Sequence, residues 1–304
     1  YVEHTFDFEE CREINRDKGF LTAEEIVELD EYCRQRFIDF VPSLATFGHL
    51  FELLQSPRYK HLGELTNYDM PKRHLWLERM RHHTIDVSNP ESFALIASLI
   101  DQYLPLFSSE YFNICCDETF DICKDRNKDK DAGAEYVKFA GKIIEHVKSR
   151  GKKVMLWGDI ILKYPEYISQ IHKDVIWLNW DYAQQPNEKD VSVFAAQKLN
   201  QIVCSGTWGW NYLVGDLRSI DNIKSLTELG HQYGAMGAMN TNWGDLGSIN
   251  NVNNSRYAIL FGAAKQWNIK TVPDAVFERI ASRRIYRNEG IIDMIREMTT
   301  REAA

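Results

Sequence analysis

Short β-rich runs alternate with amphipathic helical segments along almost the whole chain, and this alternation restricts the possible folds most strongly. The patterns predict strands at residues 1–6, 37–44, 111–116, 153–157, 174–180, 200–205 and 234–240. They predict helices at residues 22–36, 90–106, 132–150, 190–199, 218–232 and 253–267. Parallel strands need long, usually helical, crossover connections, so this order predicts a parallel α/β sheet.

The residues that follow the predicted strands distinguish a barrel from an open sheet. Polar or aromatic clusters stand at the carboxyl end of nearly every strand: Glu3-His4, Thr46-Gly48-His49, Asp117-Glu118, Trp157-Asp159, Trp180-Tyr182, Trp208-Trp210 and Trp243-Asp245. The active face of a TIM-type (β/α)8 barrel needs one cluster per strand, whereas an open sheet concentrates function at one switch point. The pattern therefore favours the barrel.

Seven strands can be counted in the sequence, where a closed barrel of this type has eight. We therefore expect the first strand to lie upstream of Tyr1. Residues 1–270 are predicted to form the catalytic barrel from its second strand onward. Residues 271–304 are predicted to form a helical C-terminal segment that begins a further helical region.

Charge and cysteine usage exclude several classes of partner. The chain has 304 residues, a net charge of -8 and a pI near 5.7, which argues against nucleic acid or an anionic membrane as its main partner. No apolar stretch approaches the roughly 20 residues that span a bilayer, and no signal peptide is visible.

The 6 cysteines lack metal-ligand spacing. We expect reduced core thiols, a cytoplasmic location, no metal and no cofactor; oligomeric state stays open.

The segment "YFNICCDETFD", residues 111–121, places two neighbouring carboxylic acids where a buried strand ends. Such a pair repels and loses hydration, so its position suggests a chemical use. Tryptophans stand at several other strand ends, and indole faces stack on the apolar face of a pyranose. Carboxylates together with tryptophans therefore indicate a sugar substrate.

The spacing of Asp117 and Glu118 restricts the mechanism. Most glycosidases place two carboxyl groups roughly 5 to 9 Å apart across the scissile bond, and sequence neighbours cannot easily straddle a sugar ring. The pair fits better if one acid contacts the glycosidic oxygen and the other a neighbouring substituent. Such a layout suits a substrate whose 2-acetamido oxygen attacks its own anomeric carbon.

The motifs resemble glycoside hydrolase family 20, the β-N-acetylhexosaminidases, and its hexosaminidase-D-like and bacterial branch. "NICCDETFD" is similar to the family's Asp-Glu strand end, "VPSLATFGH" to its third-strand segment and "LWGD" to its fifth-strand Trp. "NTNWGD" resembles the eighth-strand Trp-x-acid, and "YVEHTF" the end of the second strand. The resemblance spans about residues 1–268.

The resemblance implies roles for four catalytic residues. Glu118 would be the general acid and then the base that activates water. Asp117 would hold the acetamido N–H and stabilise an oxazolinium-like intermediate, giving retention of configuration. Glu118 must begin protonated and Asp117 ionised, and a charged neighbour favours the proton on Glu118. His49 would lie behind the acid, with Glu3 as its partner.

The resemblance also implies substrate-binding residues. Asp245 would bind the outer hydroxyl groups of the terminal sugar. Independently of the resemblance, their places at strand ends make Trp157, Trp180 and Trp243 the candidates for a pocket wall. The tyrosine that contacts the acetamido carbonyl has no clean match: Tyr212, Trp208, Asn211 and Tyr182 are the candidates. The family's first-strand Arg has no counterpart in this sequence. We expect Asp121 to cap its loop. For Asp159 a catalytic and a structural role are both open, and the structural one is favoured.

The leading interpretation is an exo-β-N-acetylhexosaminidase that removes terminal β-linked GlcNAc or GalNAc from a glycan. One alternative is a disaccharide-releasing relative such as a lacto-N-biosidase, with the long segment 47–89 as the deciding element. Another is a non-catalytic sugar-binding barrel, although the intact Asp117 and Glu118 argue against it. A metal-dependent hydrolase lacks a His-x-His cluster, and unchanged activity in a chelator would reject it.

Overall fold

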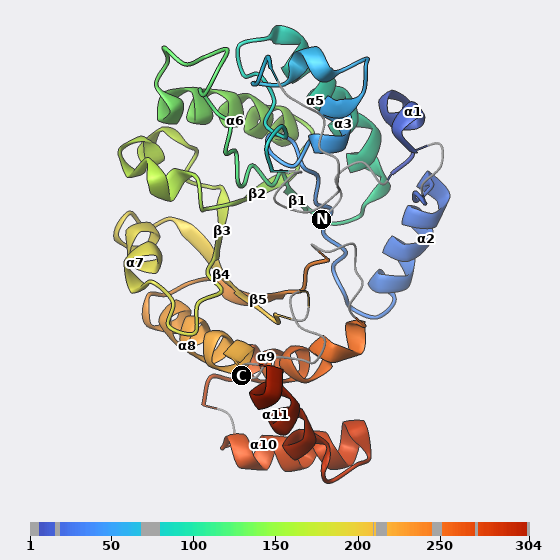
Figure 1. Ribbon diagram of the computed structural model, residues 1–304, viewed down its shortest axis with the longest axis vertical. Coiled ribbons are helices and arrows are strands. Elements are labelled where there is room, and N and C mark those ends of the chain that lie inside the picture. The colour runs from blue at the N-terminus through green and yellow to red at the C-terminus, as the bar shows by residue number, and fades with distance from the viewer. Residues whose placement is uncertain are drawn as a thin grey trace. The chain divides into compact units, whose positions relative to one another are not determined.

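The computed structural model describes residues 6–15, 19–67, 80–208, 210, 218–244, 251–270 and 273–302. The chain divides into two compact units, Tyr1–Trp177 and Leu178–Ala304. Figure 1 shows helices following strands in both units. Strand β3 (Ile176–Trp180) crosses the boundary between them.

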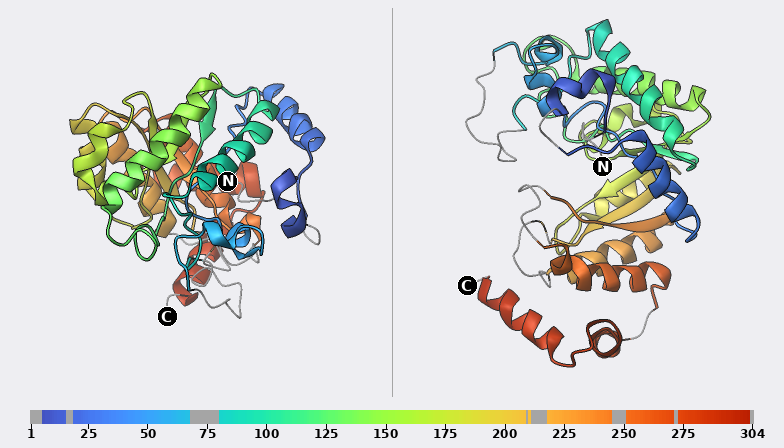
Figure 2. Two further views of the ribbon diagram at one scale, coloured as in Figure 1. Left: turned by 90° about the horizontal axis from the view of Figure 1, so that it is seen from above. Right: turned by 90° about the vertical axis from the view of Figure 1, so that its right-hand side faces the viewer.

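The first unit contains two strands that pair in parallel, β1 (Tyr111–Asn113) and β2 (Lys153–Trp157), with Tyr111 opposite Lys153. Helices α5 (Pro90–Tyr103) and α6 (Ala132–Ser149) lie side by side (Figures 1 and 2). The other elements are η1 (Glu9–Cys11), α1 (Arg12–Asn15), α2 (Ala23–Arg34), α3 (Phe51–Gln55), η2 (Lys60–Leu62), η3 (Leu104–Leu106), η4 (Ile161–Lys163) and η5 (Pro165–Gln170).

Helix starts in this unit follow the local sequence. Thr22 and Glu25 form a capping box, which satisfies two main-chain N–H groups at the start of α2. Pro90 occupies the first turn of α5, where its missing N–H costs nothing, and the Asn89 side chain caps the helix. The helices predicted at 22–36, 90–106 and 132–150 are confirmed.

The second unit contains the parallel pair β4 (Asn200–Gly206) and β5 (Gly237–Thr241), with Ile202 opposite Gly237. The end of β3 joins β4, since the Asp181 N–H donates to the Cys204 carbonyl at 3.3 Å. The other elements are α7 (Glu188–Ala196), α8 (Arg218–Gln232), η6 (Val252–Ser255), α9 (Arg256–Trp267), α10 (Asp274–Ile280), the π-helix η7 (Ala281–Tyr286) and α11 (Ile291–Glu302).

The helices of the second unit pack through small apolar clusters. Ile223 of α8 and Phe261 of α9 are buried together, and Phe277 of α10 packs against them. The ring centroids of Phe261 and Phe277 are 5.4 Å apart. The predicted helical tail is therefore attached to α9 by aromatic packing.

Two predicted strands differ from the structure, and a third lies almost wholly outside the described residues. The strand predicted at 111–116 ends at Asn113, because the Asn113 side chain accepts the Cys115 N–H at 3.0 Å and the next residues turn left-handed. Within 37–44, the pairing with β1 is one isolated parallel bridge between Ser43 and Asn113, beside a proline that has no N–H to donate. Residues 1–5 lie outside the described part, and Phe6 forms a bridge with Leu21.

Parallel pairs with intervening helices confirm the predicted β-then-α order, the arrangement from which TIM-type barrels are built. The closed eight-stranded barrel, and the division near residue 270, stay predictions. None of the helices in the described ranges has the length and apolar character needed to cross a membrane.

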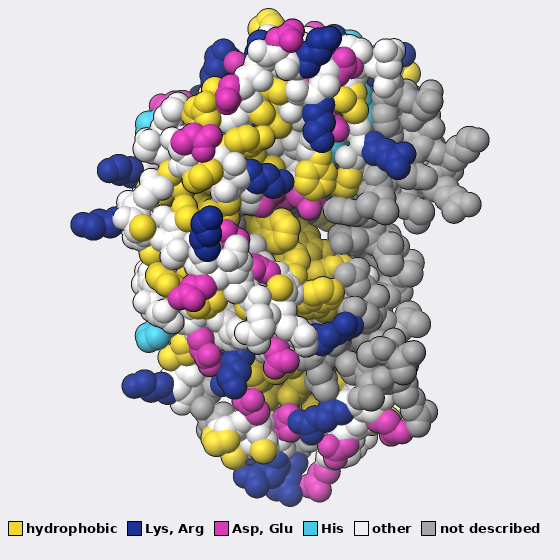
Figure 3. All heavy atoms as spheres, turned by 60° about the vertical axis from the view of Figure 1, so that its left-hand side comes forward, with side chains coloured by type: hydrophobic (Ala, Val, Ile, Leu, Met, Phe, Trp, Pro, Cys, Tyr) yellow, Lys and Arg dark blue, Asp and Glu magenta, His cyan; other side chains and the backbone are white. Residues whose placement is uncertain are grey.

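The described surface carries charges of both signs, and the cysteines form no disulfides. On the face shown in Figure 3, the described Lys and Arg side chains are scattered and alternate with Asp and Glu. All 6 cysteines are free, which confirms reduced thiols, and Cys115 and Cys116 are both buried. Burial raises the pKa of Cys116 to about 12, so these thiols are neutral small hydrophobes.

Candidate active site

The loop after Ser43 lies very close to the loop after β1. A Cβ on Gly48 would stand 2.4 Å from the Asp117 carbonyl oxygen, which only glycine avoids. The Thr46 hydroxyl donates to the Ile114 carbonyl at 2.6 Å and so joins the same two segments. The sequence "TFGH" therefore brings His49 to the Asp-Glu pair.

The main chain around the two acids has an unusual conformation. Cys115, Cys116 and Glu118 have φ values of 58°, 62° and 48°. These lie in the left-handed region, which residues other than Gly, Asn and Asp seldom occupy. Such a conformation persists only where its surroundings impose it, and it is concentrated at functional sites. The Trp157 N–H donates to the Cys115 carbonyl at 3.0 Å, which ties this turn to the end of β2.

The side chains of Asp117 and Glu118 both reach one histidine. His49 Nε2 lies 3.3 Å from Asp117 Oδ2 and 3.3 Å from Glu118 Oε2. The side chains of His49 and Asp117 are each 11% exposed, and that of Glu118 is 17% exposed. We call these three residues together with Asp159 the acid centre. The structure therefore brings three of the predicted catalytic residues together, and their roles stay predictions.

His83 holds the main chain of His49. Its Nδ1 accepts the His49 N–H at 2.9 Å, and His49 itself has a left-handed φ of 56°. Burial, with a smaller effect of His49, holds the pKa of His83 well below its usual range. A neutral ring can offer Nδ1 as an acceptor, which a charged ring cannot. His83 therefore fixes His49 through its backbone.

Asp121 lies behind His83. Its Oδ2 accepts the His83 N–H at 3.3 Å, and its own N–H donates to the Thr84 hydroxyl at 3.3 Å. Burial raises the pKa of Asp121 to about 6. These contacts agree with the expectation that Asp121 holds its loop.

Asp159 follows β2 and lies beneath Glu118. Its Oδ2 accepts the Glu118 N–H at 3.0 Å, and its Oδ1 is buried. Burial, and then the charge of Asp117, raise the pKa of Asp159 to about 7. The sequence favours a structural role for Asp159, and the structure places it in direct contact with the main chain of the predicted acid.

Two predicted residues of the first unit remain, Trp157 and Glu3. Trp157 is 3% exposed, so its indole is part of the core of this unit; its role as a pocket wall stays a prediction. Glu3 lies outside the described residues.

The second unit contains an aromatic cluster at the ends of β3, β4 and β5. Trp180 stacks on Tyr182 with ring centroids 5.0 Å apart, and the Tyr182 ring also contacts Trp210 at 5.3 Å. The Trp243 Nε1–H donates to the Tyr182 hydroxyl at 2.7 Å, and Trp208 Nε1–H to the Tyr182 carbonyl at 3.0 Å. We call these five residues the aromatic cluster. Tyr182 is its centre.

Trp180, Tyr182, Trp208 and Trp243 are each partly exposed, whereas Trp210 is buried. A Cβ on Gly206 would stand 2.6 Å from Trp210 and 2.7 Å from Tyr182, so this glycine allows the rings to approach β4. The structure therefore brings together four of the predicted sugar-binding aromatics. Tyr212 and Asp245 lie outside the described residues.

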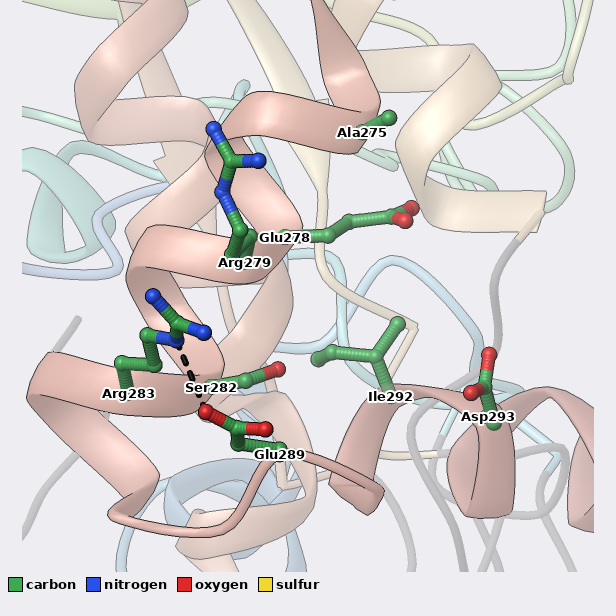
Figure 4. Close-up of a pocket in the computed structure, with 8 residues that line it drawn as sticks. All are labelled: Ala275, Glu278, Arg279, Ser282, Arg283, Glu289, Ile292 and Asp293. Atoms are coloured by element: carbon green, nitrogen blue, oxygen red, sulfur yellow. Dashed lines mark hydrogen bonds and ion pairs between the residues drawn. The ribbon is translucent and has the colours of Figure 1, made fainter.

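A pocket also lies among the C-terminal helices, lined by Ala275, Glu278, Arg279, Ser282, Arg283, Glu289, Ile292 and Asp293 (Figure 4). Arg283 Nε donates to Glu289 at 2.8 Å across it. None of the predicted catalytic or sugar-binding residues lines this pocket, and we assign it no role in the chemistry. In the described ranges, no group of three or more His, Cys, Asp and Glu side chains is placed to hold a metal ion.

Comparison with known families identifies the family of this chain. Residues 3–214 match the family model described as "Glycosyl hydrolase family 20, catalytic domain". This chain belongs to glycosyl hydrolase family 20. The match covers the acid centre and all of the aromatic cluster except Trp243.

Curated relatives in the family are distant and longer. Lacto-N-biosidase of Bifidobacterium bifidum is 24% identical over 176 residues, which are 53% of this chain and 15% of the relative. Beta-hexosaminidase of Porphyromonas gingivalis is 26% identical over 156 residues, 47% and 19% of the two chains. Hexosaminidase D of Bos taurus is 21% identical over 191 residues, 58% and 51%. The chain therefore spans about half or less of these relatives.

Solved structures of the family share the fold. The β-N-acetylhexosaminidase from Bacteroides fragilis superposes with a TM-score of 0.70 at 16% identity, covering 94% of this chain and 62% of that one. The N-acetyl-β-hexosaminidase of Streptomyces plicatus gives 0.66 at 15% identity, covering 94% and 59%. These likenesses support the TIM-type architecture of the family 20 catalytic domain.

The structure adds His83 and Gly48 to the residues around Asp117 and Glu118, and the sequence patterns point to no specific role for either. His83 stands 34 residues from His49, and "RHHTID" has no strand-end pattern that would mark it. Gly48 precedes the predicted histidine, and a glycine at a strand end could have suggested a close approach of two backbones. The contact itself appears only in three dimensions.

Proposed function

We propose that this protein is an exo-acting β-N-acetylhexosaminidase that hydrolyses terminal β-linked GlcNAc or GalNAc with retention of configuration. The observation that carries this proposal is the contact of Asp117 and Glu118 with the same His49 nitrogen. Two neighbouring acids held on one histidine cannot easily flank a glycosidic bond as acid and nucleophile do. They suit a substrate that supplies its own nucleophile.

In the first step, the acetamido carbonyl oxygen attacks the anomeric carbon while the bond to the leaving oxygen breaks. Glu118 donates its proton to that oxygen, so the aglycone leaves as an alcohol. Asp117 accepts the acetamido N–H and stabilises the positive charge of the oxazolinium-like ring. His49 orients both carboxylates, and Glu3 is proposed as its further partner.

In the second step, water attacks the anomeric carbon and opens the ring. Glu118, now ionised, takes the proton of this water and returns to its starting state. Two inversions at the same carbon restore the β configuration. No cofactor enters either step.

We propose that the aromatic cluster binds sugar, with Trp180 and Trp243 stacking on a pyranose face and Tyr182, Trp208 or Tyr212 contacting the acetamido group. Their partial exposure leaves ring surface for such contacts. Asp245 is proposed to bind the outer hydroxyl groups. Trp157 is also proposed as a pocket-wall residue. Because it is 3% exposed, only an edge of its indole ring would contact the sugar.

The full-length protein should be assayed on 4-nitrophenyl N-acetyl-β-glucosaminide beside the plain β-glucoside, with a thiazoline mimic of the oxazoline as inhibitor. Cleavage of the acetamido sugar alone, blocked by the thiazoline, supports substrate assistance. Equal cleavage of both sugars means that the enzyme supplies a nucleophile and that the role of Asp117 is wrong. Thiazoline binding without cleavage supports a sugar-binding barrel.

The similarity to a lacto-N-biosidase supports a second candidate, release of a disaccharide. The 4-nitrophenyl glycoside of lacto-N-biose distinguishes the two, because an exo-hexosaminidase releases nitrophenol from the monosaccharide and a biosidase from the disaccharide. Segment 47–89, the element expected to decide between the two functions, is described except for residues 68–79.

A further inference from the structure

Asp159 is a buried carboxyl group that the steps above do not use. It stands two residues after β2, while Glu118 follows β1. The two strands pair in parallel, so their carboxyl ends meet at one edge. This places Asp159 Oδ2 within 3.0 Å of the Glu118 main-chain nitrogen.

The contact fixes the conformation on which the acid depends. Glu118 has a φ of 48°, which a glutamate adopts only where its surroundings impose it. Its N–H belongs to the peptide plane between Asp117 and Glu118, so an acceptor for that N–H orients both side chains. Buried main-chain N–H groups need a partner, and Asp159 is the partner here.

The surroundings of Asp159 make its charge responsive to the acids. Its Oδ1 is buried and makes no hydrogen bond in the described part of the chain. Acidic, basic and neutral titratable groups face it from β1's loop, from α6 and from η4: Asp117, Glu118, Cys116, Tyr136 and Lys163. The carboxylates oppose its ionisation, and Lys163 and the Glu118 N–H favour it.

We propose that Asp159 is a positioning residue for the acid: it holds the Glu118 main chain in its left-handed conformation, and its charge favours a proton on the Glu118 carboxyl group. This role rests on the proposed function of Glu118. Asp159, the third carboxyl group of the acid centre, thus acts through Glu118 and not on the substrate.

Two substitutions in the full-length protein separate the two parts of this role. Asp159→Asn keeps an oxygen that accepts the Glu118 N–H and removes the charge. Asp159→Ala removes both. The matched control is Asp131→Asn, since the Asp131 side chain also accepts a main-chain N–H, that of Ala134 at 2.8 Å, but caps α6 on the surface.

The readout is kcat/KM against pH on 4-nitrophenyl N-acetyl-β-glucosaminide. Without the Asp159 charge, Glu118 loses its proton more easily, so Asp159→Asn should move the alkaline limb to lower pH by about half a unit or more. Asp159→Ala should also lower kcat about 100-fold, because a small misplacement of a catalytic group has an effect of this size. Asp131→Asn should keep the wild-type profile.

A second readout separates positioning from general loss of structure. With 2,4-dinitrophenol as leaving group, cleavage needs little protonation, so the loss in Asp159→Ala should shrink at least tenfold. An equal loss with both leaving groups, or an alkaline limb in Asp159→Asn that coincides with the wild type, would overturn the role of Asp159.

The outcomes for the wild type keep the two proposals apart. A wild-type protein that cleaves no acetamido sugar overturns the proposed function and this role together. An active wild type with an unshifted Asp159→Asn profile overturns the role alone. If Asp159→Ala does not fold, as thermal denaturation would show, the profile of Asp159→Asn still decides.

Discussion

The acid centre and the aromatic cluster are built by different means. In the acid centre, the functional residues are held through their main chains. The His83 side chain accepts the His49 N–H, and the Asp159 side chain accepts the Glu118 N–H. In the aromatic cluster, side chains hold one another by stacking and through the Tyr182 hydroxyl and carbonyl. The first arrangement fixes the positions of charges, and the second shapes a partly exposed surface.

This difference predicts different kinetic effects. A group that transfers a proton acts on the transition state, so its loss lowers kcat. A surface that stacks on sugar binds the ground state and the transition state alike, so its loss raises KM. Substitutions in the two regions should therefore separate into these two classes.

The largest effect is expected for Glu118→Gln, which keeps the shape and removes the acid. Because general acid–base catalysis contributes about 10²–10⁴-fold, kcat on the 4-nitrophenyl acetamido sugar should fall by that factor while KM changes little. Steady-state kinetics measure both. Glu110→Gln is the matched control, since Glu110 pairs with Lys153 on the surface. A Glu118→Gln variant with more than a tenth of the wild-type kcat would refute the acid role.

The sequence predicted the regular elements of this fold well because local signals define them. Strand β2 and helix α8 match their predicted ranges, 153–157 and 218–232, and α2 begins within one residue of the predicted helix at 22–36. Alternating apolar positions and caps act over a few residues, so a pattern can reveal them.

The geometry of the acid centre could be predicted only in part. Asp117, Glu118 and His49 follow from motifs, and the structure brings them together. The left-handed turn at Cys115 and Cys116 was not predicted, because contacts with distant residues impose it against local preference. The support from His83 likewise depends on a contact that spans 34 residues.

Asp121 tests whether the residues that support the acid centre lower the stability of the fold. Its pKa, raised from 3.8 to about 6 by burial, lies above its ordinary value. The folded state therefore binds more protons than the unfolded state between these pH values, and stability falls as pH rises through this window. Asp121→Asn should remove up to about 3 kcal/mol of this pH dependence and so stabilise the protein at pH 7.

Urea denaturation at pH 4 and pH 7 measures the effect. Asp125→Asn should act in the opposite direction, because hydrogen bonds from Thr66 hold the pKa of Asp125 below its usual range and so stabilise the fold at neutral pH. If Asp121→Asn keeps the wild-type pH dependence, the Asp121 carboxylate is not destabilised by burial.

Gly48→Ala tests the close approach that brings His49 to the acids. The new Cβ would stand 2.4 Å from the Asp117 carbonyl oxygen, so one of the two backbones must move. Overpacking of this kind costs about 1–3 kcal/mol, and the shift should also lower kcat at least tenfold. Thermal denaturation and steady-state kinetics measure the two effects.

Gly141→Ala is the matched control for this change. Gly141 lies in α6, and a Cβ there meets nothing within 4 Å. Because alanine favours a helix over glycine by about 1 kcal/mol, this variant should be as stable as the wild type or more so. Wild-type kcat in Gly48→Ala would show that the contact with Asp117 does not position the acid centre.

The smallest effect is expected for Tyr182→Phe in the aromatic cluster. This change keeps the stacked ring and removes the hydroxyl that accepts the Trp243 Nε1–H at 2.7 Å. A hydrogen bond of this kind contributes about 1 kcal/mol, which corresponds to a KM about fivefold higher. The kcat should stay within about twofold, since uniform binding is lost rather than transition-state stabilisation. Tyr233→Phe, which removes a surface hydroxyl that donates to Glu188, should leave both constants unchanged. If Tyr182→Phe instead lowers kcat more than KM rises, Tyr182 acts on the transition state, and the aromatic cluster shares in the chemistry assigned to the acid centre.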